Sequence, residues 1–255
     1  MLTSRSQILL SICTFAVPGL FPVTELYAQR PAPAAVASTA GLVLQATANP
    51  ARPEALLDPE ARAWQGLPAQ RVALNRTPSL YDTDPPSELE IPYVDLRLAR
   101  ADGKLLLHLT WSDLTRNAAE IAALPSSGPE TRNLKEQSAA TDRFFDAAAV
   151  MFPARASENG VWPSLQMGDA GDPVEIYYWN AARGAMRMKA EGRTTTRRTG
   201  ETFPARAHYG SGAWQVTMEL PNMPAAGLPL ALAIWNGAQQ DRDGRKYFSV
   251  WLRLE

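Results

Sequence analysis

The chain has 255 residues, and its 25 lysines and arginines against 26 aspartates and glutamates give a formal net charge of −1. Such a near-neutral chain with scattered charges does not fit a protein whose main partner is nucleic acid. Its one cysteine, Cys13, lies in a segment predicted to be removed, which excludes disulfides, iron–sulfur clusters, cysteine-ligated zinc and covalently attached haem from the mature chain.

Residues 1–28 are predicted to form a secretory signal peptide. Arg5 supplies the positive start, 8–23 is mostly apolar, and Ala28 offers a small residue at the cleavage point. The apolar run is shorter and more interrupted than the roughly 20 residues that span a membrane, although an uncleaved anchor is the alternative. No later segment is apolar enough to cross a bilayer, so we expect an exported mature chain without a membrane span.

Residues 29–69 are expected to be a flexible leader with one short helix. The first half is rich in alanine and proline, while 56–67 has acidic residues near its start and a helical spacing of apolar residues. A single domain over 70–255 follows, with a first short strand at 70–75.

From Tyr93 onward the pattern is that of β-structure. The Asp102-Gly103 pair between 93–100 and 104–111 predicts a hairpin. In the second strand the alternation places four apolar residues on one face: Leu105, Leu107, Leu109 and Trp111. His108 falls on the other face with Lys104 and Thr110, where solvent exposure is expected rather than metal binding.

Five further strands are predicted, at 146–152, 174–180, 214–220, 231–235 and 246–254. The stretch 231–235 is continuously apolar and is expected to be central, covered on both faces. An alanine-, serine- and glutamate-rich excursion at 117–141 and a polar connection at 190–204 interrupt the series. Strands at this spacing predict a mainly β fold, an antiparallel β-sandwich with short helical excursions.

Lys246 opens the last of these strands. Every second residue from Lys246 onward is apolar, and in a strand such residues lie on one face, so Lys246 is expected on an apolar face. These residues are Phe248, Val250, Leu252 and Leu254. A lysine directed inward needs a partner or loses its proton, and deprotonating a normal lysine at pH 7 costs about 4.6 kcal/mol. A bond from nitrogen to a metal offsets that cost. The alternative is a lysine at the end of a strand whose amine reaches solvent.

Met167 opens a glycine-rich turn, M-G-D-x-G-x-P-V, that runs directly into the aromatic strand at 174–180. Gly168 and Gly171 allow the backbone to approach a flat ligand closely. The alternative for Met167 is a core residue that fills an irregular gap, which is a common use of methionine.

A second glycine-containing motif lies near the end of the chain, with W-x-G-A beginning at Trp235 and G-R-K ending at Lys246. Taken together, the two motifs resemble the haem-binding gamma subunits of the ethylbenzene dehydrogenase group, within the type II DMSO reductase family of complexes. The resemblance covers about Tyr93 to Glu255. It implies a b-type haem in the sandwich, with Met167 and Lys246 as the axial ligands of the iron. Gly168, Trp235 and Arg245 are expected beside the haem, with Arg245 placed to pair with a propionate.

The resemblance also implies a role and partners. The gamma subunits of this group are periplasmic electron-transfer subunits that carry out no substrate chemistry themselves. They assemble with an iron–sulfur subunit and a molybdopterin catalytic subunit, and a soluble cytochrome c is the expected external carrier. The group includes complexes that oxidise hydrocarbons, dimethyl sulfide or nitrite and complexes that reduce selenate or chlorate, so no particular substrate is implied.

Other interpretations of the sequence remain open. His208 is the reserve candidate for the second iron ligand, and a small basic cluster (Arg193, Arg197 and Arg198) is most simply a solvated loop. A secreted carbohydrate-binding sandwich is the main alternative function, with four tryptophans as candidate sugar platforms: Trp162, Trp179, Trp235 and Trp251. A third interpretation keeps the family's fold without haem, as a structural subunit.

Overall fold

The computed structural model describes residues 42–78, 89–118, 144–155, 161–220, 227 and 229–255. The predicted signal peptide and nearly all of the predicted excursion at 117–141 lie outside these ranges. Among the described helices, none has the length and apolar character that a membrane crossing requires.

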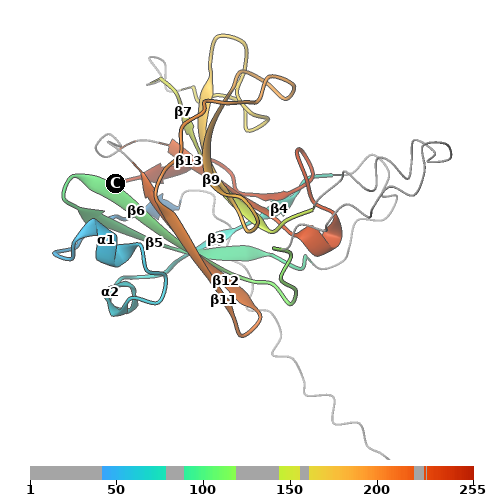
Figure 1. Ribbon diagram of the computed structural model, residues 1–255. Coiled ribbons are helices and arrows are strands. Elements are labelled where there is room, and N and C mark those ends of the chain that lie inside the picture. Colours follow the sequence, from blue (N-terminus) through green and yellow to red (C-terminus); the bar gives the residue numbers. More distant parts are fainter. Residues whose placement is uncertain (1–41, 79–88, 119–143, 156–160, 221–226, 228) are drawn as a thin grey trace, which may run out of the picture. The chain divides into compact units, whose positions relative to one another are not determined.

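Two β-sheets pack face to face, as the sequence predicted (Figure 1). The first sheet has the order β11 (Ala205–Gly210), β12 (Ala213–Leu220), β6 (Lys104–Ser112), β5 (Tyr93–Ala101) and β2 (Thr47–Ala48), and β3 (Gln70–Ala73) also pairs with β5. The second sheet has the order β1 (Val43–Leu44), β15 (Leu252–Leu254), β13 (Pro229–Trp235), β7 (Ala147–Pro153), β8 (Val174–Asn180), β9 (Gly184–Ala190) and β10 (Arg197–Arg198), and β14 (Tyr247–Phe248) joins β13 to β4 (Asn75–Arg76). The pairs β1–β15 and β2–β5 are parallel, and the other described pairs are antiparallel.

The core between the sheets comes from the alternation of side chains along the strands. In β6 the face that carries Leu105, Leu107 and Leu109 is fully buried against the second sheet, as predicted. Each such leucine contributes about 1.5–3 kcal/mol by leaving water. The hairpin between β5 and β6 is also confirmed, because Asp102 and Gly103 both have positive φ, at 47° and 74°, as a type I′ turn requires.

The outer face of the first sheet is covered by the short helices α1 (Pro53–Leu56) and α2 (Arg62–Gln65), seen in blue beside β5 and β6 in Figure 1. Trp64 from α2 packs against His108, with ring centroids 5.1 Å apart, and the His108 Nε2 lies 3.0 Å from the carbonyl oxygen of Pro59. His108 is therefore buried, and the prediction that it faces solvent is wrong. The alternation gave its face correctly, but it could not show that the segment before β3 folds back over that face.

Part of the predicted leader belongs to the sandwich. β1 pairs with β15 in the second sheet, and β2, three residues further on, pairs with β5 in the first. Leu44 is fully buried in the shared core. The described residues 42–69 thus tie the two sheets together, and they hold two short helices where one was expected.

The predicted last strand is divided into β14 and β15 by a β-bulge. Phe248 is paired with Ala233, and Leu252 is paired with Leu230. Between these two pairs the last strand advances by four residues, from Phe248 to Leu252, while β13 advances by three, from Ala233 to Leu230. The last strand therefore has one extra residue. Ser249 fills the gap: its backbone N–H donates to the carbonyl oxygen of Leu232 (2.9 Å), and its hydroxyl accepts from the N–H of Leu232 (2.8 Å).

Because of the extra residue, odd-numbered and even-numbered side chains exchange faces of the sheet at the bulge. Before it, Tyr247 points into the shared core while Phe248 points to the outer face; after it, Leu252 and Leu254 point into the core. The prediction that Lys246 shares a face with Leu252 and Leu254 is therefore wrong. Lys246 lies on the outer face of the second sheet.

Candidate functional site

The outer face of the second sheet is apolar, which is unusual for a sheet face that is not covered by another layer. It is built from the alternate residues of three central strands, β7, β8 and β13: Ala147, Ala149, Met151, Val174, Ile176, Ala231 and Trp235. The opposite parity, including Tyr177 and Trp179, faces the shared core. This outer face forms the floor of a cleft.

The cleft has a volume of about 1450 Å³. That exceeds the roughly 300–1,000 Å³ of most small-molecule sites, so a broad ligand fits. Its walls come from the turn that carries Met167, from the segment between β13 and β14, and from the connection between β9 and β10. The cleft lies on the outside of one sheet, whereas the sequence resemblance implied a ligand within the sandwich.

Met167 is held in an unusual backbone conformation. Its φ is +77°, in a region that L-residues other than glycine rarely adopt and that costs about 1–3 kcal/mol. Three hydrogen bonds hold the surrounding turn: from Gly168 N to Ser164 O (2.9 Å), from Ser164 N to the Asp169 carboxylate (2.8 Å), and from Gly192 N to Met167 O (2.8 Å). Strain that the surrounding structure maintains in this way is a mark of functional positions.

Gly168 was expected to let the backbone approach a flat ligand, but in the structure it allows a close approach within the protein itself. Its φ is +79°, and a Cβ placed there would lie 2.8 Å from the carbonyl oxygen of Asp172 and 3.2 Å from that of Ala190. The missing side chain therefore makes room for the protein's own backbone. Gly168 shapes the turn that presents Met167 and does not provide the contact surface for a flat ligand.

Met167 and Lys246 meet across the cleft. The Lys246 Nζ donates to the Met167 Sδ at 3.5 Å and lies 5.4 Å from the centre of the Trp235 ring. Among the described residues, this amine has no carboxylate within ion-pair distance, and a thioether is a weak acceptor. The backbone of Lys246 is fixed, because its carbonyl oxygen accepts from both the N–H and the hydroxyl of Thr77, each at 3.0 Å.

The surroundings make the neutral form of this lysine accessible. Burial, and after it the positive charge of Arg193, lower the pKa of the Lys246 amine to about 8, with Asp243 acting in the opposite direction. Deprotonation at pH 7 then costs about 1.4 kcal/mol, compared with about 4.6 kcal/mol for an unperturbed lysine. A thioether and a neutral amine each have a lone pair to donate to iron, so the two side chains form a donor set that suits a haem.

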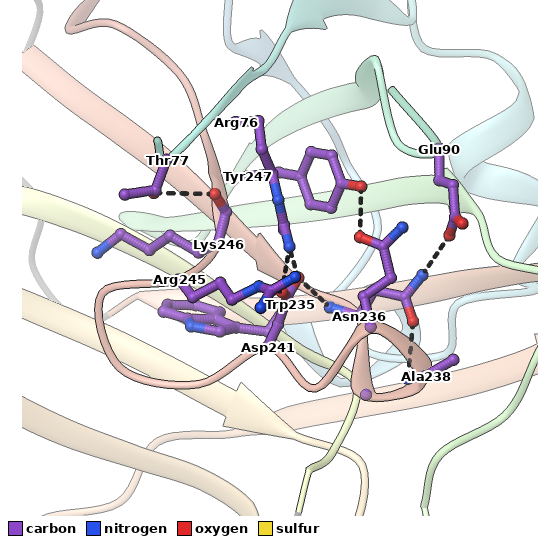
Figure 2. Close-up of polar contacts among 12 residues, drawn as sticks. Arg76, Thr77, Glu90, Trp235, Asn236, Ala238, Asp241, Arg245, Lys246 and Tyr247 are labelled. Carbon is purple, nitrogen blue, oxygen red and sulfur yellow. Dashed lines mark hydrogen bonds and ion pairs between the residues drawn. The ribbon is translucent and has the colours of Figure 1, made fainter. Parts of the chain in front are cut away.

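Arg245 turns away from the cleft. Its Nε lies 3.5 Å from the Asp241 carboxylate, which also accepts two hydrogen bonds from Arg76, at 2.5 and 2.6 Å (Figure 2). The buried Asp241 accepts a further bond from the backbone N–H of Asn236 (3.1 Å). This network holds the segment between β13 and β14, and Arg245 is not among the residues that line the cleft.

Other predicted residues are placed as follows. Trp235 lines the cleft, with its Nε1 donating to the carbonyl oxygen of Asp243 at 3.3 Å. His208, the reserve iron ligand, lies on β11 of the first sheet, where its Nδ1 is 3.3 Å from the Glu60 carboxylate. The structure therefore brings Met167, Lys246 and Trp235 together and leaves His208 in the other sheet.

Phe248 lines the cleft as an aromatic wall and was not identified from the sequence as a site residue. Tyr178 adds a second aromatic wall, and its ring packs edge-on against Trp235 at 5.4 Å. Arg193 and Arg198, interpreted as part of a solvated loop, also line the cleft. The alternation along β8 puts Tyr178 on the face opposite Trp179, which is the face that forms the cleft.

The tryptophans do not form an open sugar platform. Trp179 and Trp235 are 5% and 8% exposed, so neither presents an indole face to a polysaccharide. Trp162 and Trp251 are half-buried and pack edge-on against each other at 6.3 Å, and Trp251 donates to the carbonyl oxygen of Pro163.

No family model matches the chain. Among solved structures, the chain is similar to a carbohydrate-binding module of family 9 from Caldicellulosiruptor kristjanssonii in complex with glucose. That match has 10% sequence identity and a TM-score of 0.40, and it covers 84% of this chain and 96% of the module. The same kind of module in complex with cellotriose has 8% identity and a TM-score of 0.42. At these TM-scores the likeness carries no argument about function.

Three curated proteins are each 29% identical to this chain. One, from Haloferax mediterranei, bears the name of a respiratory nitrate reductase haem subunit, ORF7; the match covers 76% of this chain and 66% of that protein, just under two thirds of its length. The second is the gamma subunit of chlorate reductase from Ideonella dechloratans, with 77% of this chain and 78% of the subunit covered. The third is the gamma subunit of dimethylsulfide dehydrogenase from Rhodovulum sulfidophilum, with 76% and 73% covered. The resemblance carried by the two sequence motifs is thereby confirmed: the chain is similar to haem and gamma subunits of reductase and dehydrogenase complexes.

Proposed function

We propose that this chain is a periplasmic electron-transfer subunit that binds a b-type haem between Met167 and Lys246. The observation that carries the proposal is the approach of the Met167 Sδ to the Lys246 Nζ, at 3.5 Å, over an apolar floor. The relatives named as haem or gamma subunits of reductase and dehydrogenase complexes support it. A bound haem supplies a centre that accepts and releases one electron at a time.

The residues of the chain set the properties of that centre. A thioether ligand favours the reduced iron and raises the reduction potential. Met167 and the Lys246 amine would hold the iron from its two sides, and a haem held in this way would relay single electrons. The apolar floor keeps water from the ligands, while the strained turn and the two bonds from Thr77 hold the donor atoms in place.

The ligand assignment is tested by spectra of the purified protein, produced with an ample supply of haem. We expect the wild type to be red, with the sharp bands of a six-coordinate reduced haem. Met167→Ala and Lys246→Ala should each lose these bands or convert them to those of a five-coordinate haem, because one donor atom is removed.

The matched controls are two residues of β9. Met186→Ala removes another methionine that lines the cleft, and Lys189→Ala removes a partly exposed lysine. Both should keep the wild-type bands. If the Met167 and Lys246 variants also keep them, the ligand assignment is wrong. If the wild type is colourless, the haem function itself is wrong and a haem-free structural subunit remains.

The proposal includes partners. We propose an iron–sulfur subunit and a molybdopterin catalytic subunit as permanent neighbours, with a soluble cytochrome c as external carrier. Affinity purification of the tagged chain from its native host should recover both subunits together with molybdenum, whereas recovery of the chain alone would contradict complex membership. Cleavage after Ala28, measured as the N-terminal residue of the recovered chain, tests export through the signal peptide.

A further inference from the structure

The connection between β9 and β10 is fixed to the turn that presents Met167. The backbone N–H of Gly192 donates to the carbonyl oxygen of Met167 at 2.8 Å. The Thr195 hydroxyl closes the loop on itself, accepting from the N–H of Glu191 (2.6 Å) and donating to the carbonyl oxygen of Gly192 (2.9 Å). A loop held by these bonds keeps its side chains at set positions relative to the Met167 sulfur.

This loop and β10 direct two arginines to the cleft and one away from it. Arg193 and Arg198 line the cleft together with Thr194 and Thr196, whereas Arg197 does not. The alternation of a β-strand explains the difference, because neighbours on β10 point to opposite sides. Among the described residues, neither Arg193 nor Arg198 has a carboxylate within ion-pair distance.

The cleft has both apolar and charged lining. Leu165, Ile176, Met188 and Phe248 belong to its apolar walls, and the exposed side chains of Arg193 and Arg198 line it as well. Its other charged residues besides Lys246 are Arg183, Asp241, Arg242 and Asp243. A guanidinium presents a planar fork of donors that matches a carboxylate in two parallel hydrogen bonds. A ligand that satisfies both surfaces is broad and apolar and carries carboxylates along one edge.

We infer that Arg193 and Arg198 bind the two carboxylates of the ligand, and so select a tetrapyrrole in its free dicarboxylate form. The inference rests on the proposed haem function and deepens it, since it names the groups that orient the macrocycle between Met167 and Lys246. Arg193 and Arg198 thus take the carboxylate-binding role expected of Arg245, which its contact with Asp241 holds outside the cleft.

Binding of haem and of haem dimethyl ester tests the inference, because the ester keeps the iron and the macrocycle but lacks both negative charges. Both compounds are titrated into the protein in one detergent solution, and the quenching of tryptophan fluorescence measures the affinity. Wild type should bind haem about tenfold or more tightly than the ester, which corresponds to about 1.4 kcal/mol. Arg193→Gln and Arg198→Gln should each lose most of this preference, with little change in affinity for the ester.

Arg197→Gln is the matched control, since it removes the same charge from the same strand on the side away from the cleft. It should behave as the wild type. If the wild type takes up haem with the expected ligand bands but does not distinguish it from the ester, the inference is wrong and the proposed function stands. If neither porphyrin binds, both are wrong. Thermal unfolding of each variant separates loss of a contact from loss of the fold.

Discussion

At the scale of single residues, Met167 and Lys246 each occupy a position that is unfavourable for stability. Met167 has a positive φ, and Lys246 is a half-buried amine whose one hydrogen-bond acceptor among the described residues is a sulfur atom. Neither feature strengthens the fold, and the proposed haem, bound by both side chains, would account for both. The sequence motifs predicted this pair, although spacing alone could not show that two residues 79 positions apart would meet.

Asp113 is a third residue in an environment that is unfavourable for its side chain. It is 4% exposed, and burial, reinforced by the charge of Asp146, raises its pKa to about 6. One carboxylate oxygen accepts from the N–H and the hydroxyl of Thr115, while the other, Oδ2, has no hydrogen-bond partner among the described residues. The charged form is therefore disfavoured in the folded chain.

The pH dependence of stability follows from that shift. Between the unfolded pKa, near 3.9, and about 6, the folded chain binds more protons at Asp113 than the unfolded chain does. This residue therefore lowers the free energy of unfolding as pH rises through that window, by about 3 kcal/mol at most. Asp113→Asn, which cannot ionise, should be more stable than the wild type above pH 6 and should lose that advantage near pH 4.

Urea unfolding at pH 4, 5, 6 and 8 measures the effect. Asp102→Asn is the control: it removes the same charge at an exposed turn position where asparagine is equally suited. A difference between Asp113→Asn and the wild type that stays constant across this pH range would contradict the assignment.

At the scale of elements, the turn between Ser164 and Asp172 determines where the Met167 sulfur lies. Gly168→Ala should destabilise the chain by about 2 kcal/mol or more, because the added Cβ meets the carbonyl oxygen of Asp172 at 2.8 Å in a backbone region that alanine rarely adopts. It should also shift the haem bands, since the clash displaces the neighbouring ligand.

Gly171→Ala provides the comparison. Gly171 also has a positive φ, at +90°, but a Cβ there meets nothing within 4 Å. Its substitution should cost only the backbone term, about 1 kcal/mol, and leave the haem bands unchanged. Equal losses of stability in the two variants, measured by urea unfolding, would show that the close contact at Gly168 has no effect.

The elements also show where the sequence patterns stop being informative. Apolar patterns, alternating or continuous, located the strands β5 to β8, β12 and β13 because each buries one face or both. It missed β9 and β11, which lie toward the edges of the sheets and whose side chains are mostly half-exposed. The bulge at Ser249 was also invisible, because one extra residue changes the register without any change of composition.

At the scale of the whole molecule, the described part of the chain has three apolar clusters, one between the sheets and one on the outer face of each. The fold class was predictable, because it follows from the spacing of strands and turns. The use of the outer faces was not, because alternation shows that a face is apolar but not what covers it. One face is covered by the chain's own helices and the other forms the floor of the cleft.

This division predicts how the ligand affects stability. The core between the sheets is complete without a ligand, so the haem-free chain should keep a β-type circular dichroism spectrum and unfold cooperatively. Haem at about one hundred times its dissociation constant should add about 2.7 kcal/mol, which raises the melting temperature by about 5–11 °C for a domain of this size.

Melting curves recorded with and without haem, for the wild type and for the Lys246→Ala variant, measure this shift. The variant should show a smaller rise, because it lacks one bond to the ligand. A haem-free wild type that lacks a cooperative transition would mean that the ligand is part of the core.

The position of the cleft on the outside of a finished sheet has a consequence for maturation. The proposed haem site lies outside the core between the sheets, so the two sheets can close before a haem arrives, whereas a group enclosed between them would have to arrive first. Under the proposed function, folding and haem loading would then be separate stages. A cell short of iron would accumulate folded chains and load them when supply returns.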